Sequence, residues 1–138
     1  MTKSWLSGLS YFAIAFAAGF ALGVVRVLWL MPAMGDLAAV ALELPVILVF
    51  SWFVCGWLIK RFDVPTTLSD RAAMGAVAFG VLMLAELGVS TLLTGASVSE
   101  HFEAYRSPAG ALALLGQIAF ALFPIFRLRP SRTPLPAA

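Results

Sequence analysis

The chain has few charged side chains and few residues of the kinds that bind metals or form disulfides. Only 12% of its 138 residues are Asp, Glu, Lys or Arg, whereas 62% are hydrophobic. An average soluble domain has about 25% charged and about 45–50% apolar residues. This composition excludes a separate soluble domain and predicts an integral membrane protein.

Cysteine and histidine each occur once. The single Cys55 excludes a disulfide within the chain, and the single His101 excludes a haem held by two histidines of one chain. The sequence has no GxSxG, HExxH or CxxC motif and no phosphate-binding glycine loop. We therefore expect a protein that is not an enzyme, with no catalytic residues, no bound metal and no cofactor.

Four long apolar runs account for most of the chain. They cover residues 5–30, 37–59, 72–94 and 108–126, and a helix of about 20 residues is long enough to cross a bilayer. They predict one all-α domain, residues 1–126, folded as a transmembrane four-helix bundle with an antiparallel, up-down-up-down path. Residues 127–138, with three prolines and three arginines, are predicted to form a disordered cytoplasmic tail.

Positive charges outside the apolar runs gather on one side of the predicted membrane. That side carries Lys3, Lys60, Arg61, Arg71, Arg127, Arg129 and Arg132. Only Arg106 falls on the other side, so the positive-inside rule places both termini in the cytoplasm. We expect a multi-pass protein of the cell inner (plasma) membrane. Cations at helix ends beside an anionic leaflet need no nucleic-acid partner.

Short polar segments predict where the second and third helices begin. The tight turn at residues 31–36 ends in Asp36, whose carboxylate is expected to cap the second helix. Ser69 or Asp70 is expected to cap the third helix in the same way.

The last loop carries two further capping signals. Ser107 followed by Pro108 predicts the start of the fourth helix. Ser97 and Glu100 have the spacing of a capping box, which predicts a short helix over residues 98–106 on the outer surface.

Each apolar run contains one polar or charged residue at a similar depth. These residues are Arg26, Glu43, Glu86 and Gln117. At a rise of about 1.5 Å per residue, each lies about 12–14 Å below the outer end of its helix. Ionisable groups inside hydrocarbon are rare and costly, and they are held by partners or used for proton, ion or substrate work. This polar layer is the predicted functional site.

Small residues share helix faces with two members of the polar layer. Gly19 and Gly23 form a GxxxG element on the face of Arg26, and Gly110 and Ala113 lie on the face of Gln117. Small residues let helices approach closely in membranes, so we expect these faces to pack inward.

The polar layer divides into two pairs. Arg26 and Glu43 are level on adjacent helices, and a guanidinium suits pairing with a carboxylate, which predicts a structural ion pair. Glu86 is then left without a counter-charge. Either it has a functional role as a proton or cation site, or it is a neutral acid hydrogen-bonded to Gln117.

Two classes of function fit these features. The first is a small transporter or channel coupled to protons or ions, in which Glu86 exchanges protons or binds a cation. The second is a non-catalytic accessory subunit, or a lipid or pigment binder, whose small-residue faces dock a partner. In both cases the chain lies in the lipid bilayer, and we expect a homo-oligomer or a subunit of a larger membrane complex. A membrane enzyme with Glu43 or Glu86 as a general base is a distant third.

Overall fold

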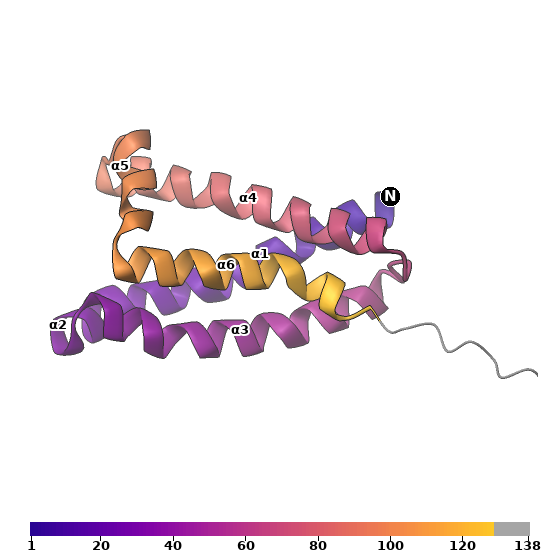
Figure 1. Cartoon of the computed structure of the whole chain (residues 1–138), viewed down its shortest axis with the longest axis horizontal. Coiled ribbons are helices and arrows are strands. Elements are labelled where there is room, and N and C mark those ends of the chain that lie inside the picture. The colour runs from indigo at the N-terminus through magenta and orange to yellow at the C-terminus, as the bar shows by residue number, and fades with distance from the viewer. Residues whose placement is uncertain (129–138) are drawn as a thin grey trace, which may run out of the picture.

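The long helices of the molecule lie side by side. The structure, a computed structural model, describes residues 1–128, so the predicted tail beyond Leu128 lies outside the described residues. Within them the only regular elements are helices, which confirms the predicted all-α class. Figure 1 shows the four long helices along the longest axis of the molecule. They are α1 (Thr2–Val25), α3 (Asp36–Arg61), α4 (Leu68–Thr94) and α6 (Pro108–Phe126).

Short helical elements connect the long ones. Helix α1 continues without a break into the π-helical turn η1 (Arg26–Leu30) and then into α2 (Met31–Met34). Between α4 and α6, the helix α5 (Val98–Glu103) and the 3-10 turn η2 (Ala104–Arg106) cross one end of the molecule (Figure 1). The short helix predicted over residues 98–106 is therefore confirmed.

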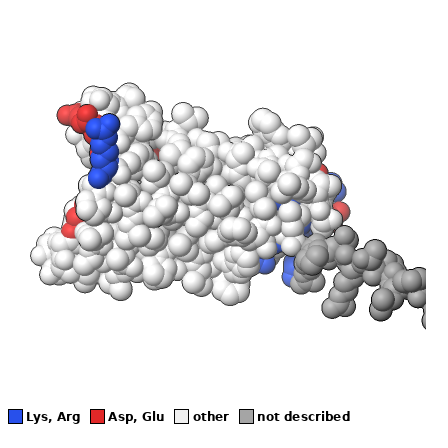
Figure 2. Space-filling view, viewed as in Figure 1, with Lys and Arg blue, Asp and Glu red and all other residues white. Residues whose placement is uncertain are grey.

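Each of the four helical segments is long and apolar enough to cross a membrane, so the chain is a multi-pass membrane protein. The segments are Thr2–Met34, Asp36–Arg61, Leu68–Thr94 and Pro108–Phe126. The predicted spans lie inside these helices. The first helical segment begins three residues earlier and ends four later than expected, and the third begins four residues earlier. On the face drawn in Figure 2, charged side chains gather toward the two ends of the molecule, and a broad band between them is uncharged.

The two ends of the bundle differ in packing. We call the end that holds Met1, the connection 62–67 and Arg127 the terminal end, and the end that holds Gly35 and the segment 95–107 the far end (Figure 1). The core lies toward the terminal end. Its buried residues are Tyr11, Ala15, Cys55, Leu58, Val64, Met74, Ala78 and Phe120.

Close contacts between helices hold the terminal end together. The hydroxyl of Tyr11 donates to the carbonyl oxygen of Phe120 at 3.1 Å, and the two rings stack with centroids 4.1 Å apart. A Cβ atom at Gly75 would collide with the carbonyl oxygen of Ala121. Glycine at position 75 therefore allows α4 to pack directly on α6.

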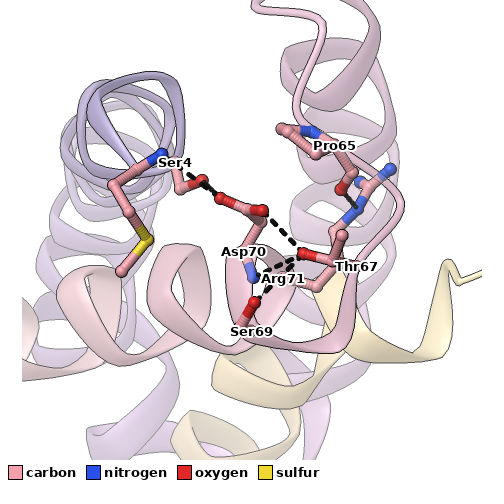
Figure 3. Close-up of polar contacts among 7 residues, drawn as sticks. Ser4, Pro65, Thr67, Ser69, Asp70 and Arg71 are labelled. Carbon is pink, nitrogen blue, oxygen red and sulfur yellow. Dashed lines mark hydrogen bonds and ion pairs between the residues drawn. The ribbon is translucent and has the colours of Figure 1, made fainter.

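A polar cluster joins the first turn of α1 to the first turn of α4 (Figure 3). Ser4 donates to one carboxylate oxygen of Asp70 at 2.7 Å, and the Thr67 hydroxyl donates to the other at 2.6 Å. Thr67 also accepts from the Asp70 backbone N–H at 3.1 Å, so Thr67 is the N-cap of α4. The predicted cap at Ser69 or Asp70 is wrong, because α4 already begins at Leu68. The carboxylate of Asp70 accepts from Ser4 instead.

The other predicted caps had mixed outcomes. Ser97 and Glu100 form the full capping box, and Ser107 accepts from the N–H of Gly110 at 3.0 Å, as predicted. Asp36 makes no capping hydrogen bond with its side chain. Gly35 is the N-cap instead, with φ 84°, because the sharp turn after α2 requires a backbone conformation that glycine adopts without strain.

Packing loosens toward the far end. The last buried residue of α1 is Ala15, and the last of α4 is Ala78. Beyond these positions, the far halves of α1 and α4 pack less closely and border a cavity that is partly open at the surface.

Candidate functional site

The cavity lies in the far half of the bundle and has a volume of about 690 Å³. All four long helices line it, and the segment of α5 and η2 borders it at the far end. Most of its wall is apolar, including the rings of Phe16, Phe20 and Phe120. The four residues of the predicted polar layer, Arg26, Glu43, Glu86 and Gln117, all line this one cavity.

Arg26 and Glu43 form the ion pair that the sequence predicts. The Nε atom of Arg26 lies 3.4 Å from Oε2 of Glu43, and the two side chains are 28% and 13% exposed. Neither atom has a hydrogen-bond partner among residues 1–128. The pair is therefore a single ionic contact. The guanidinium of Arg26 does not form the bidentate pair of hydrogen bonds that an arginine can make with a carboxylate.

Arg26 begins the π-helical turn η1. The N–H of Met31 donates to the carbonyl oxygen of Arg26, five residues earlier. Such single π turns within α-helices are frequently found at functional sites. Sequence periodicity carried no signal for this turn.

Glu86 is held by neutral groups. Both of its carboxylate oxygens accept from Nε2 of Gln117 at 2.7 Å, and Oε2 also accepts from the hydroxyl of Tyr105 at 3.3 Å. The amide oxygen of Gln117, Oε1, is buried and has no hydrogen-bond partner within residues 1–128. Glu86 thus has hydrogen-bond donors around it but no direct ion pair among residues 1–128.

The hydrogen bonds continue from Glu86 toward the far end of the molecule. The Tyr105 hydroxyl lies 3.4 Å from Nε2 of His101, which is half-buried. When Tyr105 donates its proton to Glu86, the His101 ring nitrogen is the donor to Tyr105. We call the series Gln117, Glu86, Tyr105 and His101 the polar chain. It extends from the cavity to α5.

Sequence reasoning did not assign Tyr105 to the site. One signal was present, since residues four apart lie on one helical face and His101 and Tyr105 have that spacing. Burial and the Glu86 carboxylate raise the pKa of Tyr105 to about 12. Tyr105 therefore keeps its proton at neutral pH and acts as a hydrogen-bond donor.

The four small residues predicted for helix packing also line the cavity. A Cβ atom at Gly19 would come no closer than 3.8 Å to Ile47, and one at Gly23 no closer than 3.9 Å to Arg26. Gly110 packs against the carbonyl oxygen of Ala104 in η2, and Ala113 is half-buried. Within the chain, Gly19 and Gly23 thus give room to the cavity and are not points of close helix contact.

Residues with metal-binding chemistry are spread apart. Among residues 1–128, no three His, Cys, Asp or Glu side chains come together in a group that could hold a metal ion. Cys55 is buried in the core of the terminal end.

Comparisons of the chain with protein-family models, curated proteins and solved structures find no match.

Proposed function

We propose that this protein is a small transporter or channel of the inner membrane, coupled to protons or ions, with Glu86 as the coupling group. In this proposal the chain crosses the membrane four times in an antiparallel, up-down-up-down path with both termini in the cytoplasm. One observation carries the proposal. Glu86 faces a cavity within the bundle and is joined by hydrogen bonds through Tyr105 to His101 near the far surface.

The charges around the cavity explain why Glu86, and not Glu43, is the coupling group. Glu43 has the guanidinium of Arg26 as its counter-charge. Within the described part of the chain, the direct partners of Glu86 are an amide and a phenol, and both can stay in place whether the carboxyl group is ionised or protonated. A change of charge at Glu86 therefore breaks no ion pair.

The polar chain gives protons a route to Glu86. Hydroxyl and imidazole groups can each accept and donate a proton. A proton taken up at His101 reaches Glu86 through the single hydroxyl of Tyr105. At the terminal end, the buried core around Tyr11 and Met74 closes the bundle. Transport by this site requires that core to open in a second conformation.

Parts of the cavity wall are exposed at the surface of the chain. Leu28 and Leu93 line the cavity and are 64% and 69% exposed. A second copy of the chain, another membrane subunit or lipid would cover these side chains. In this proposal the chain is a homo-oligomer or a subunit of a larger membrane complex, and a partner covers these side chains.

Proton flux through reconstituted protein tests the proposed function. Liposomes with purified protein and an internal pH dye are placed under an imposed membrane potential, and the rate of internal pH change is recorded. We expect flux with the native chain and only the leak of protein-free liposomes with Glu86→Gln. The matched control is Glu103→Gln, which alters an exposed glutamate outside the polar chain and should keep the native rate. Equal flux from the native chain and Glu86→Gln overturns the proposal.

The apolar wall of the cavity favours a second function, the binding of a lipid or pigment by an accessory subunit. Purification from the native membrane separates the two. A stoichiometric lipid or pigment in the purified protein, together with no flux dependent on Glu86, supports the second function.

A further inference from the structure

We propose that the cavity binds a lipophilic organic cation of single positive charge, and that this cation replaces the proton held by Glu86. The inference rests on the proposed transport function and names the class of its substrate. It is carried by the charge, the lining and the volume of the cavity.

The wall of the cavity carries charges of both signs. Its charged side chains are one guanidinium, Arg26, and two carboxylates, Glu43 and Glu86. With His101 and Tyr105 neutral, the wall carries one net negative charge when both acids are ionised. An uncompensated charge in a medium of low dielectric constant is costly. One proton or one monovalent cation brings the wall to neutrality, and the two compete for Glu86.

The cavity favours a ligand of positive charge. The guanidinium of Arg26 has Glu43 as its partner at 3.4 Å, so an anion in the cavity would find that guanidinium already neutralised. A cation finds the Glu86 carboxylate held by neutral donors alone, with the Gln117 amide oxygen free of partners among the described residues. The electrostatics therefore select a cation.

The lining of the cavity indicates the chemical nature of the cation. Hard divalent cations take about six or more oxygen ligands, whereas the cavity wall is mostly apolar. The rings of Phe16, Phe20 and Phe120 line it, and aromatic faces attract organic cations through the ring quadrupole. The wall thus fits a cation whose charge is embedded in apolar or aromatic groups.

The volume of the cavity suits a small organic molecule. The cavity of about 690 Å³ lies within the usual range of small-molecule sites, about 300–1,000 Å³. Gly19 and Gly23 contribute to this space because no side chain projects from the helix at those positions. A drug-sized organic cation fits such a volume.

Tetraphenylphosphonium and tetraphenylborate provide a matched pair of probes, because they share size and shape and differ in the sign of the charge. Binding of each to the purified protein in detergent is measured by equilibrium dialysis, and proton release is measured with a pH indicator in weakly buffered solution. We expect saturable binding of tetraphenylphosphonium with release of one proton for each cation bound, and no saturable binding of tetraphenylborate. Over the range in which Glu86 is protonated, affinity should fall about tenfold for each unit of decreasing pH, as linkage to one proton requires.

Variants assign the exchange to Glu86 and to the cavity. Glu86→Gln should lose both the proton release and the binding of tetraphenylphosphonium, whereas Glu103→Gln should keep both. Gly19→Leu fills part of the cavity without altering its charge, and it should weaken binding of the cation. Size-exclusion chromatography and circular dichroism check that each variant is folded.

The outcomes separate this inference from the proposed function. If the native chain shows Glu86-dependent proton flux but does not bind tetraphenylphosphonium, the substrate class is wrong and the transport function stands. Equal binding of the two probes, or binding of the cation without proton release, also overturns the inference. If the cation binds with proton release but no flux depends on Glu86, the transport function is overturned and the site is a binding site alone.

Discussion

The Nε2 atom of Gln117 lies 2.7 Å from each of the two carboxylate oxygens of Glu86. The amide nitrogen has two hydrogens, so one side chain of α6 satisfies both oxygens of a carboxyl group on α4. The same carboxyl group keeps room for the hydroxyl of Tyr105 at 3.3 Å. This arrangement holds Glu86 in place without neutralising it, which is the property that a proton-exchanging group in a membrane requires.

Replacement of Arg26 by alanine should destabilise the protein. It leaves the Glu43 carboxylate, 13% exposed, without its counter-charge. Loss of one partner of a buried pair costs about 3–5 kcal/mol, and we expect about 2 kcal/mol here because Arg26 is partly exposed to the cavity. Thermal unfolding in detergent, followed by circular dichroism, measures the change.

The double variant Arg26→Ala, Glu43→Gln is the control for this pair. It removes the stranded charge, so it should be more stable than Arg26→Ala alone. An unchanged unfolding midpoint in Arg26→Ala would show that the ion pair does not stabilise the bundle.

Two glycines of α4 should respond in opposite ways to alanine. At Gly75 the added methyl group collides with the carbonyl oxygen of Ala121, whereas at Gly80 it meets no atom within 4 Å. Overpacking costs about 1–3 kcal/mol, so Gly75→Ala should lower the unfolding temperature. Gly80→Ala should raise stability by roughly 0.5–1 kcal/mol, because alanine loses less backbone entropy in a helix. Equal effects at the two positions would contradict the close packing of α4 on α6.

The long helices could be predicted from the sequence because each apolar run carries its own signal of length and hydropathy. Helix starts were harder to predict. Thr67, Ser69 and Asp70 can all cap a helix, and Thr67 is the one whose hydroxyl accepts from the Asp70 N–H. Thr67 and Asp70 have the spacing of a capping box, a local signal that the prediction missed. The π turn at Arg26 has no local sequence signal.

The candidate site was predicted in part. Counting residues from helix ends placed Arg26, Glu43, Glu86 and Gln117 at one depth, and all four line one cavity. Tyr105 was missed because its contact with Glu86 depends on how η2 sits over the end of the bundle. Helical periodicity also cannot tell a glycine that borders a cavity, such as Gly19, from one that packs against a helix.

Tyr105→Phe should slow proton flux. The change removes the one hydroxyl that joins Glu86 to His101 and keeps the ring. Its effect on stability should be small, about 0.5–1.5 kcal/mol for one hydrogen bond. The measurement is the initial rate of internal pH change in proteoliposomes.

Thr91→Val is the control, since it removes a hydroxyl of α4 that donates to the carbonyl oxygens of Leu87 and Gly88 in the same helix. It should keep the native flux. A Tyr105→Phe variant with the native rate would show that protons reach Glu86 by another route.

The capping box of α5 should weaken in acid. Hydrogen bonds from the backbone and side chain of Ser97 hold the pKa of Glu100 below its ordinary value. A carboxyl group with a lowered pKa stabilises the folded form above its unfolded pKa, and this contribution is lost as the pH falls through the folded pKa. Hydrogen exchange at the N–H groups of Ser97 and Glu100 should therefore lose protection at acid pH, below the ordinary range of glutamate.

The control for this prediction is Glu100→Gln, whose side chain accepts the same backbone hydrogen bond and does not titrate. Its protection should vary with pH less than that of the native chain. If the native chain and Glu100→Gln lose protection in parallel, the capping carboxylate is not the cause.

Infrared difference spectroscopy tests the central claim most directly, namely that Glu86 takes up and releases a proton in the membrane. Spectra of the purified protein in lipid are recorded at acid and alkaline pH, and the difference in the stretching region of protonated carboxyl groups is compared among variants. The account predicts a band from a carboxyl group that titrates in the native chain and in Glu43→Gln and is absent from Glu86→Gln. A band that persists unchanged in Glu86→Gln would contradict it.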